Sequence, residues 1–257
     1  MKISIVTACL NSASTIRDAL DSMLAQDHAA REHIVVDGGS TDGTLGILGE
    51  YAGRIDRLIG GPDRGMYDAI NKGIAAATGD VVGILHADDV YESAAVLSTV
   101  ARAFAAAPEA DIVFGDLVFV KPGDLRRVVR RYGSKSFRPW KLRFGWMPPH
   151  PASFIRRSAY ARIGPYAIDL RISSDYEMFV KAFLVHRLAY RRVDRVLVRM
   201  RTGGLSTSGL KSSLLLNREI VTACRRNGVY TNLPLVLLKL PLKLAELIGK
   251  GGPGVLV

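Results

Sequence analysis

The sequence predicts an α/β protein in which a mainly parallel sheet is covered by helices on both faces. Short runs rich in Val and Ile alternate with segments of helical periodicity through the first 120 residues. Apolar residues make up 48% of the chain, which is enough to build a sizeable core. Parallel neighbouring strands require crossover connections, and the intervening helices supply them.

Five strands separated by four helices are expected in this first half. In the first helix, Ile16, Leu20, Met23 and Leu24 recur at the spacing of one helix face. The strands are expected at 2–8, 32–37, 55–60, 79–87 and 110–120, and the helices at 12–26, 40–52, 66–78 and 93–108.

The second half begins with a segment that breaks this rhythm. Residues 121–150 mix Arg, Pro and aromatic residues without a clear period, which predicts irregular structure around a site or a packed loop. A helix is then expected at 173–186, a strand or hairpin at 188–201, and a second helix at 210–228.

The small number of cysteines and the character of the first residues limit the class of protein. The two cysteines, Cys9 and Cys224, exclude a disulfide framework and a Cys-rich zinc site. The run MKISIVTACLN holds a short apolar stretch that ends in polar residues, so it predicts a first strand rather than a signal peptide. A cytoplasmic location is therefore expected.

The net charge of +11 is unevenly distributed along the chain. Residues 1–120 hold 8 Lys and Arg against 17 Asp and Glu, a net charge of −9. Residues 121–257 hold 27 against 7, a net charge of +20. The acidic half suits a cation, whereas the basic half suits phosphates, an anionic lipid surface or nucleic acid.

Polar side chains follow four consecutive strands of the expected sheet. Ligands of open α/β sheets bind outside the carboxyl ends of the strands. Because each strand delivers polar groups to that edge, a binding site is expected there. The residues are Thr7 and Asn11 after the first strand, Asp37 after the second, Asp63 and Arg64 after the third, and His86, Asp88 and Asp89 after the fourth.

The string VVDGGSTDGT at residues 35–44 is the most specific of these local motifs. Asp37 can accept two donors from a ligand, and the following glycines let the backbone approach closely. The string matches neither GxGxxG nor the P-loop pattern, which disfavours a standard dinucleotide site and a P-loop. A glycine-rich turn without a ligand is the alternative.

The sequence resembles the family 2 glycosyltransferases in four ordered motifs: SIVTACLN, VVDGGSTDGT, DRGMYDAINKG and LHADD. The resemblance continues more weakly to about residue 207, where HPASFIRR, SSDYEMF and RTGGLS match. It is closest to bacterial non-processive enzymes that build surface polysaccharides, because the QxxRW string of processive members is absent.

The resemblance implies the GT-A fold, a Rossmann-like fold of nucleotide-diphospho-sugar transferases with a C-terminal helical extension. Residues 1–120 would be the nucleotide-sugar-binding half. Residues 121–207 would be the acceptor-binding and catalytic-base half of the same domain. Residues 208–257 would be C-terminal helices that could associate with a membrane.

The resemblance also assigns roles to the residues at the sheet edge. Thr7 and Asp37 would hold the base of a nucleotide-sugar donor. Asp88 would contact the ribose or the metal, and Asp89 would bind Mn²⁺ or Mg²⁺, hard cations that prefer oxygen ligands. His86 stands where the family often has another acid or polar residue. The remaining donor contacts would be Asn11, Asp63, Arg64 and Asn71.

The later motifs supply a candidate base and acceptor contacts. Asp175 in SSDYE matches the family's catalytic base, which would take the proton of the acceptor hydroxyl. A favourable acid in the first helical turn behind a Ser cap is the alternative. His150, Arg201 and Ser206 are candidates for contacts with the acceptor or the diphosphate; a structural His and a glycine turn are the alternatives.

These features predict an inverting, metal-dependent glycosyltransferase. It would move a sugar from a nucleoside diphosphate donor to an acceptor hydroxyl, on a glycan or lipid-linked oligosaccharide of cell-surface polysaccharide synthesis. A sugar-phosphate nucleotidyltransferase is one alternative, but its Gly-rich basic signature near the N-terminus is missing. A non-catalytic basic nucleic-acid-binding protein is another, but it leaves the acidic edge unexplained, so no nucleic-acid partner is expected.

The segment NLPLVLLKLPLKLAELIGK near the C-terminus is apolar but interrupted by charges and proline, so a membrane span is not expected. Lys239, Lys243, Glu246 and Lys250 recur at helical spacing, which suits an interfacial helix at the inner face of an anionic membrane. Packing on the chain's own domain, or on a second subunit to give a homo-oligomer, is the alternative.

Overall fold

The computed structural model describes residues 1–203 and 210–238. In this part of the chain one sheet of nine strands has the order β3-β2-β1-β4-β8-β6-β9-β5, with β7 paired to β6. The strands are β1 (Ile3–Cys9), β2 (Arg31–Asp37), β3 (Arg57–Gly60), β4 (Val81–Ile84), β5 (Val90–Tyr91), β6 (Ile112–Lys121), β7 (Asp124–Tyr132), β8 (Ser153–Arg156) and β9 (Tyr190–Arg201).

The half of the sheet formed by β3, β2, β1 and β4 is parallel, as the sequence predicts. All seven residues of β1 are buried, because a central parallel strand is covered on both faces. The register sets Cys9 opposite Asp37 and Asp37 opposite Gly60. The carboxyl ends of β1, β2 and β3 therefore lie side by side.

The other half of the sheet is mixed. β8 runs antiparallel to both neighbours, β4 and β6, and β5 runs antiparallel to β9, whereas β6 and β9 are parallel. The predicted α/β class is confirmed, but only the half formed by β3, β2, β1 and β4 is parallel throughout. β5 and β8 have two and four residues, which is too short for a periodic sequence signal.

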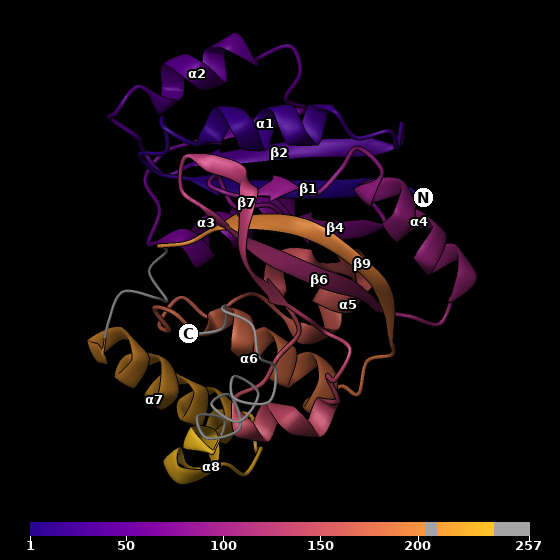
Figure 1. The fold of residues 1–257 in the computed structure, drawn as a ribbon, viewed down its shortest axis with the longest axis vertical. Helices are drawn as coiled ribbons and strands as arrows, with labels where there is room; N and C mark the ends of the chain where they lie inside the picture. The colour runs from indigo at the N-terminus through magenta and orange to yellow at the C-terminus, as the bar shows by residue number, and fades with distance from the viewer. Residues whose placement is uncertain (204–209, 239–257) are drawn as a thin grey trace.

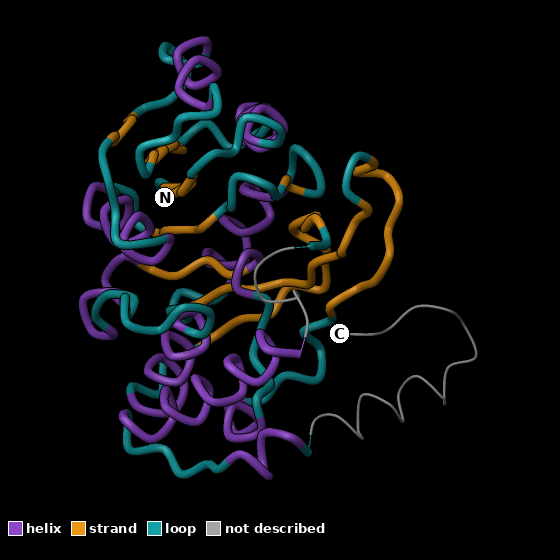
Figure 2. The backbone as a smooth tube through the Cα atoms, turned by 90° about the vertical axis from the view of Figure 1, so that its left-hand side faces the viewer, coloured by secondary structure: helices purple, strands orange, loops and turns teal. Residues whose placement is uncertain are grey.

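Residues 121–150 are more regular than the sequence predicts. β7 forms a hairpin with β6, so the expectation of irregular structure is wrong for 124–132. Val128 and Val129, on opposite faces of β7, are each 49% exposed. A strand without a buried face has no apolar–polar alternation, which is why DLRRVVRRY gives no strand signal. β7 lies in front of the sheet in Figure 1 and at the right-hand side in Figure 2.

Helices cover both faces of the sheet (Figure 1). Val6 of β1 packs in one core with residues of α3, α5 and α6, while Ile5 packs in another with residues of α1 and α4. The helices are α1 (Ile16–Leu24), α2 (Thr44–Glu50), α3 (Met66–Ala76), α4 (Val96–Ala106), α5 (Arg157–Ile163), α6 (Ser174–Val180), α7 (Leu210–Arg226) and α8 (Leu233–Leu237), with short helical segments at Pro139–Phe144, His150–Ala152 and Lys181–Val185.

Helix α7 shares a core with α6. Ile220, Ala223 and Cys224 of α7 are buried in the same cluster as Tyr176 and Phe179 of α6. At least the first part of the predicted C-terminal extension therefore packs on the domain. The charged residues predicted for an interfacial helix, Lys239, Lys243, Glu246 and Lys250, lie outside the described residues. Among the described helices, none has the length and apolar character needed to cross a membrane.

Candidate active site

The site begins where β1 and β2 end. Asn11 has a φ of 50°, a left-handed conformation that Asn tolerates better than most residues. Its side-chain oxygen accepts the Thr41 amide at 2.9 Å, and its own amide donates to Ser40 Oγ at 2.8 Å. Asn11 thus ties the loop after β1 to the glycine-rich turn after β2, and its side chain stays exposed at the edge.

Asp37 organises the glycine-rich turn that follows it. Its Oδ2 accepts the backbone amides of Gly39 and Ser40, each at 2.9 Å. Gly39 has a φ of 94°, which favours glycine. A Cβ on Gly38 would collide with the carboxylate of Asp63. The string VVDGGS therefore builds a tight turn and brings Asp37 and Asp63 close to each other.

The segment after β3 carries exposed charge beside Asp63. Asp63 Oδ1 accepts the amide of Gly65 at 2.8 Å. The guanidinium of Arg64 contacts Asp68 at 2.8 Å while its side chain remains 72% exposed. Hydrogen bonds from Arg64 lower the pKa of Asp68 to about 2. Asp68 therefore stays ionised and fixes the start of α3, while Arg64 places an exposed positive charge at this edge.

Asp88 and Asp89 follow β4 in different environments. Asp89 is fully buried, and within the described residues neither of its carboxylate oxygens has a hydrogen-bond partner. Burial raises the pKa of Asp89 well above its ordinary value and the adjacent Asp88 raises it further, while the nearby amide and charge of Arg201 oppose part of that rise. Asp88 is partly exposed, and the Arg201 guanidinium binds its carbonyl oxygen and the carboxylate of Asp18 on α1.

The residues after β4 fit a divalent cation. A buried carboxylate without donors is costly, and a cation would remove that cost. No group of three His, Cys, Asp or Glu side chains converges to hold a metal within 1–203 and 210–238. The Asp88–Asp89 pair instead suits a hard cation that completes its shell with substrate phosphates and water.

A chain of aromatic contacts leads from this pair toward Asp175. The rings of His86 and His150 are 6.0 Å apart, and His150 Nε2 lies 2.8 Å from the hydroxyl of Tyr166. Tyr166 stacks on Tyr67 at 5.9 Å, and the Tyr67 hydroxyl donates to Asp175 Oδ1 at 3.4 Å. This series of contacts, which passes through Tyr67 on α3, links the motif LHADD to the motif SSDYEMF, although the two are far apart in sequence.

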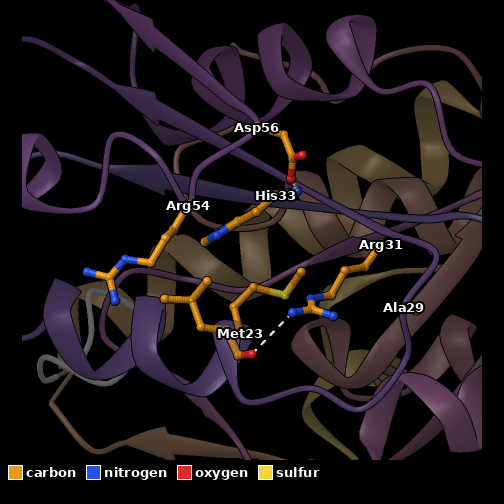
Figure 3. A pocket seen from close by; sticks show the side chains of 7 residues that line it. Met23, Ala29, Arg31, His33, Arg54 and Asp56 are labelled. Atoms are coloured by element: carbon orange, nitrogen blue, oxygen red, sulfur yellow. Dashed lines mark hydrogen bonds between the residues drawn. The ribbon is translucent and has the colours of Figure 1, made fainter.

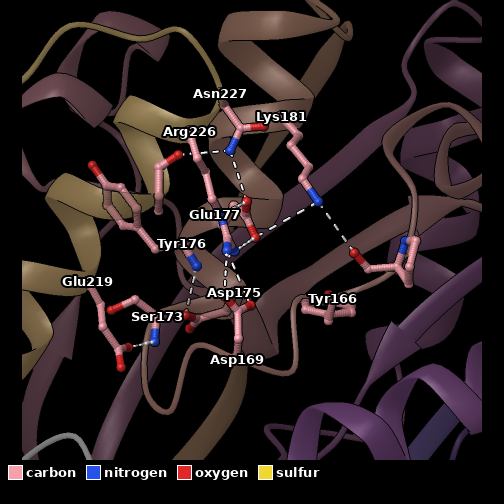
Figure 4. A network of polar contacts seen from close by, with 12 residues as sticks. Tyr166, Asp169, Ser173, Asp175, Tyr176, Glu177, Lys181, Glu219, Arg226 and Asn227 are labelled. Atoms are coloured by element: carbon pink, nitrogen blue, oxygen red, sulfur yellow. Dashed lines mark hydrogen bonds and ion pairs between the residues drawn. The ribbon is translucent and has the colours of Figure 1, made fainter.

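Asp175 is the second residue of α6. Figure 4 shows it beside Tyr176 within a network of polar contacts. Burial raises its pKa to about 6, and the hydrogen bonds from the Tyr176 amide and the Tyr67 hydroxyl limit that rise. A carboxylate with this pKa can accept a proton near neutral pH. The geometry allows Asp175 to act as a base as well as a helix-start acid.

Three predicted site residues make structural contacts that leave their predicted roles unsupported. Thr7 is fully buried, with its hydroxyl 3.0 Å from Nε2 of His33. Asn71 exchanges two hydrogen bonds of 2.8 Å with the backbone of Tyr166. His150 is buried, and burial lowers its pKa to about 3, so it is neutral. Ser206 lies outside the described residues.

Two tyrosines of the site, Tyr67 and Tyr166, are not identified by sequence reasoning. Tyr67 lies inside the motif DRGMYDAINKG, but an aromatic residue on a helix is typical of a core position. Tyr166 lies outside all the motifs. Their contacts with Asp175 and His150 depend on the packing of α3 against the loop before α6.

A cavity of about 320 Å³ lies at the opposite end of β2 (Figure 3). Its lining includes Arg31 and His33 at the start of the strand, whereas Asp37 stands at the end. Arg54 and Asp56, from the loop before β3, complete its polar wall. This cavity is therefore separate from the carboxyl-end site.

Comparison with known proteins agrees with this architecture. A glycosyltransferase of Mycobacterium tuberculosis, named for PGL/p-HBAD biosynthesis, is 34% identical over 80% of this chain and 79% of its own length. A fragment of S. aureus TarS in complex with UDP-GlcNAc superposes with a TM-score of 0.70 at 17% identity, covering 95% of this chain and 73% of that one.

Two further comparisons define the fold and its extent. The mannosyltransferase PcManGT from Pyrobaculum calidifontis, in complex with GDP-Man and Mn²⁺, has a TM-score of 0.61 at 18% identity, covering 97% of this chain and 81% of that one. In another crystal structure of the TarS fragment, the match spans 65% of that chain. These likenesses show the GT-A fold.

The family description "Glycosyl transferase family 2" matches residues 4–164, which include the strand ends that carry Asp37, Asp63 and Asp89. Together with the curated relative of 34% identity, this match covers the greater part of the chain. The chain belongs to glycosyl transferase family 2 and is a glycosyltransferase with the GT-A fold.

Proposed function

We propose that the chain is an inverting, metal-dependent glycosyltransferase that transfers one sugar from a nucleoside diphosphate to an acceptor hydroxyl. The observation that carries this proposal is Asp89, a fully buried carboxylate whose two oxygens accept no hydrogen bond of good geometry in the described part of the chain. Membership of the family favours this activity over a nucleotidyltransferase and over a nucleic-acid-binding protein.

The donor would lie along the carboxyl ends of β1 to β4. Asp37 and Asp63 stand close together there and would face the base. The Oδ1 of Asp37 accepts a long contact of 3.7 Å from Cys9 Sγ. Arg64 and Asn11 are exposed at the same edge and can contact ribose or phosphate. The roles predicted for Thr7 and Asn71 stay predictions.

Asp88 and Asp89 would hold Mn²⁺ or Mg²⁺. A cation bound there would neutralise the charge that develops on the diphosphate leaving group. Arg201 holds the backbone of Asp88 and thereby fixes the direction of the pair. The fold neighbour PcManGT was crystallised with GDP-Man and Mn²⁺, which is consistent with a divalent cation in this fold.

Asp175 would act as the base that accepts the proton of the attacking hydroxyl. Attack from the side opposite the diphosphate would invert the anomeric configuration. The pKa of about 6 allows the carboxylate to be ionised before attack at neutral pH. His150 and Arg201 remain candidates for acceptor or diphosphate contacts.

The acceptor is proposed to be a lipid-linked glycan at the inner face of an anionic membrane. The charge of +20 beyond residue 120 supports attraction to such a surface. Trp140 is 57% exposed within this basic half, as an interfacial aromatic residue would be. Tyr230 and Leu238, near α8, are exposed and could form part of the predicted homo-oligomer contact.

The decisive experiment is a panel of UDP- and GDP-sugars incubated with the protein, with Mn²⁺ or with EDTA. We expect metal-dependent release of the nucleoside diphosphate from one donor. Asp89→Asn should reduce turnover by about 100-fold or more with the fold intact, because it removes the charge that the cation needs. Asp124→Asn, at an exposed acid that begins β7, is the matched control and should not change turnover.

Each contrary outcome has a clear meaning. Equal turnover of Asp89→Asn and the parent protein would remove the metal assignment. Release of pyrophosphate from a nucleoside triphosphate and a sugar phosphate would instead support the nucleotidyltransferase. Retention of the anomeric configuration in the product would contradict direct attack.

A further inference from the structure

The loop that precedes α6 is held by a single carboxylate from α7. Glu219 Oε1 accepts the backbone amide of Arg171, and its Oε2 accepts the amides of Ile172 and Ser173, all at 2.9 Å. Glu219 is only 8% exposed. Helix α6 begins at the next residue, so Asp175 is two positions beyond the last anchored amide.

Three consecutive amides that point to one place need an acceptor. Each buried amide without a partner would cost about 1–3 kcal/mol. A carboxylate is well suited to them, since hydrogen bonds to a charged acceptor are shorter and stronger than neutral ones. Glu219 therefore fixes the backbone conformation of residues 171–173.

The same loop is fixed from its other side by α3. The Tyr67 hydroxyl donates its one proton mainly to the carbonyl oxygen of Ile172 at 2.7 Å, with a longer second contact to Asp175 Oδ1 at 3.4 Å. Ile172 thus has its amide bound by α7 and its carbonyl bound by α3. A loop held at both peptide groups has little freedom to move the carboxylate of Asp175.

Helix α7 makes a second contact with this region through Arg226 at its C-terminal end (Figure 4). The Arg226 guanidinium binds the carboxylate of Asp169 at 2.9 and 3.1 Å and also binds Glu177 on α6. Asn227 adds a hydrogen bond of 2.9 Å to Glu177. This second contact holds α6 without touching the amides that Glu219 binds.

Glu219 also differs in charge from the other groups around Asp175. Tyr67 from α3, Tyr132 from β7 and Tyr166 from the loop before α6 all act on this site. Burial raises the pKa of each, to about 12 for Tyr132 and well above the ordinary value for Tyr67 and Tyr166, so all are neutral at physiological pH. Burial is the main cause of the raised pKa of Asp175, and the charge of Glu219 adds a smaller rise.

We propose that Glu219 is a positioning residue for the catalytic base: it anchors the amides of 171–173 and so sets the position and the charge environment of Asp175. This inference rests on the proposed role of Asp175 as base. It makes α7, which lies beyond the residues matched to the family, part of the catalytic apparatus.

The test compares Glu219→Gln with Arg226→Gln as a matched control. Gln cannot satisfy three amides with one carbonyl oxygen, so amide hydrogen exchange at 171–173 should accelerate by about 10-fold or more. Metal-dependent donor turnover should fall by about 10- to 100-fold with the Kd for the nucleoside diphosphate unchanged, since the donor residues lie on β1–β4.

The pH profile provides the readout that a purely structural role would not change. Loss of the negative charge favours ionised Asp175, so the acidic limb of turnover should move to lower pH in Glu219→Gln. Arg226→Gln should lower the melting temperature, but the pH at which turnover declines in acid should stay the same as in the parent protein. Glu219→Asp keeps the charge, so it should keep the limb and recover part of the rate.

Three outcomes would overturn the proposal: protected amides at 171–173 in folded Glu219→Gln, an unmoved acidic limb, or an equal shift in Arg226→Gln. If Glu219→Gln does not fold, Glu219→Asp decides, because unchanged turnover in that variant also overturns it. If the parent protein turns over no donor, the proposed function fails; the exchange measurement still reports separately on the anchoring by Glu219.

Discussion

At the scale of single residues, the site contains two buried carboxyl groups whose surroundings differ. Burial raises the pKa of both Asp89 and Asp175. Asp175 keeps two donors, the Tyr176 amide and the Tyr67 hydroxyl, which hold its pKa at about 6. Among the described residues no hydrogen bond of good geometry reaches the carboxylate of Asp89, and the nearby amide and charge of Arg201 only partly oppose the rise in its pKa. The first is therefore suited to proton transfer and the second to a cation.

The role of Asp175 can be tested by Asp175→Asn. The amide cannot accept a proton, so turnover should fall by about 10²- to 10⁴-fold while donor binding is retained. In the parent protein turnover should decline as the pH falls through about 6, because the base is active only when ionised. Titration calorimetry with the nucleoside diphosphate and a pH profile of turnover check both statements.

If Asp175→Asn kept the turnover of the parent protein, the assignment of Asp175 as the base would be wrong. An acidic limb near pH 4, the ordinary value of an aspartate, would show that burial does not control its ionisation.

At the scale of elements, Glu32 joins three segments at the end of the sheet opposite the site. Its carboxylate accepts the Ser4 hydroxyl at 2.5 Å and both the amide and hydroxyl of Thr78 at 2.9 Å. β1, β2 and the turn after α3 are thereby fixed to one another. Burial alone would raise the pKa of Glu32, but these hydrogen bonds outweigh it and lower the pKa to about 2.

Glu32→Gln should destabilise the fold at pH 7 by about 1–3 kcal/mol, because the charged acceptor is lost. Since the pKa of Glu32 is lowered in the folded state, its contribution is present above pH 4.5 and is lost as the pH falls toward 2. The free energies of unfolding of the two proteins should therefore converge in acid. Urea unfolding at pH 7, 4 and 3 measures this.

Glu50→Gln is the control for this experiment. Glu50 forms an exposed ion pair with Arg17, and such pairs contribute little to stability. A difference between Glu32→Gln and the parent that stays constant from pH 7 to 3 would contradict the assignment.

At the scale of the whole molecule, the charge division follows the architecture. The acidic first 120 residues contain the parallel half of the sheet with its predicted cation site, together with β5 and most of β6, whereas the basic remainder begins at the turn that leads into β7. On β7, Arg126 and Arg127 are exposed beside Val128. The hairpin therefore presents positive charge and apolar surface together, a combination that suits an anionic membrane.

The pair of substitutions Arg126→Gln and Arg127→Gln should weaken binding to vesicles rich in phosphatidylserine by about 10-fold or more. Binding of the parent protein should fall as salt is raised, because charges exposed at a membrane surface are screened. Cosedimentation with phosphatidylserine and with phosphatidylcholine vesicles measures both effects. Arg54→Gln with Arg102→Gln, on the acidic half, is the control and should leave binding unchanged.

Equal binding to both kinds of vesicle, or equal weakening by both pairs of substitutions, would contradict a membrane-facing role for the hairpin.

The sequence alone determines the α/β class, the family resemblance and the strand ends where the site lies. These features are local: hydrophobic periodicity, glycine turns and the acids that follow β2, β3 and β4 are each contained in a few consecutive residues. Asp37, Asp63 and Asp89 are therefore found at the edge that the sequence predicts.

Only the tertiary structure reveals the features that have no local sequence pattern. β7 has no buried face to impose a period, β5 and β8 are too short for one, and Thr7 is buried against His33 although it lies near the end of β1. The ties of Tyr67 and Glu219 to the loop that holds Asp175 join residues 105 or 47 positions apart. Such pairs are set by the packing of α3 and α7 against one loop, which no short stretch of sequence encodes.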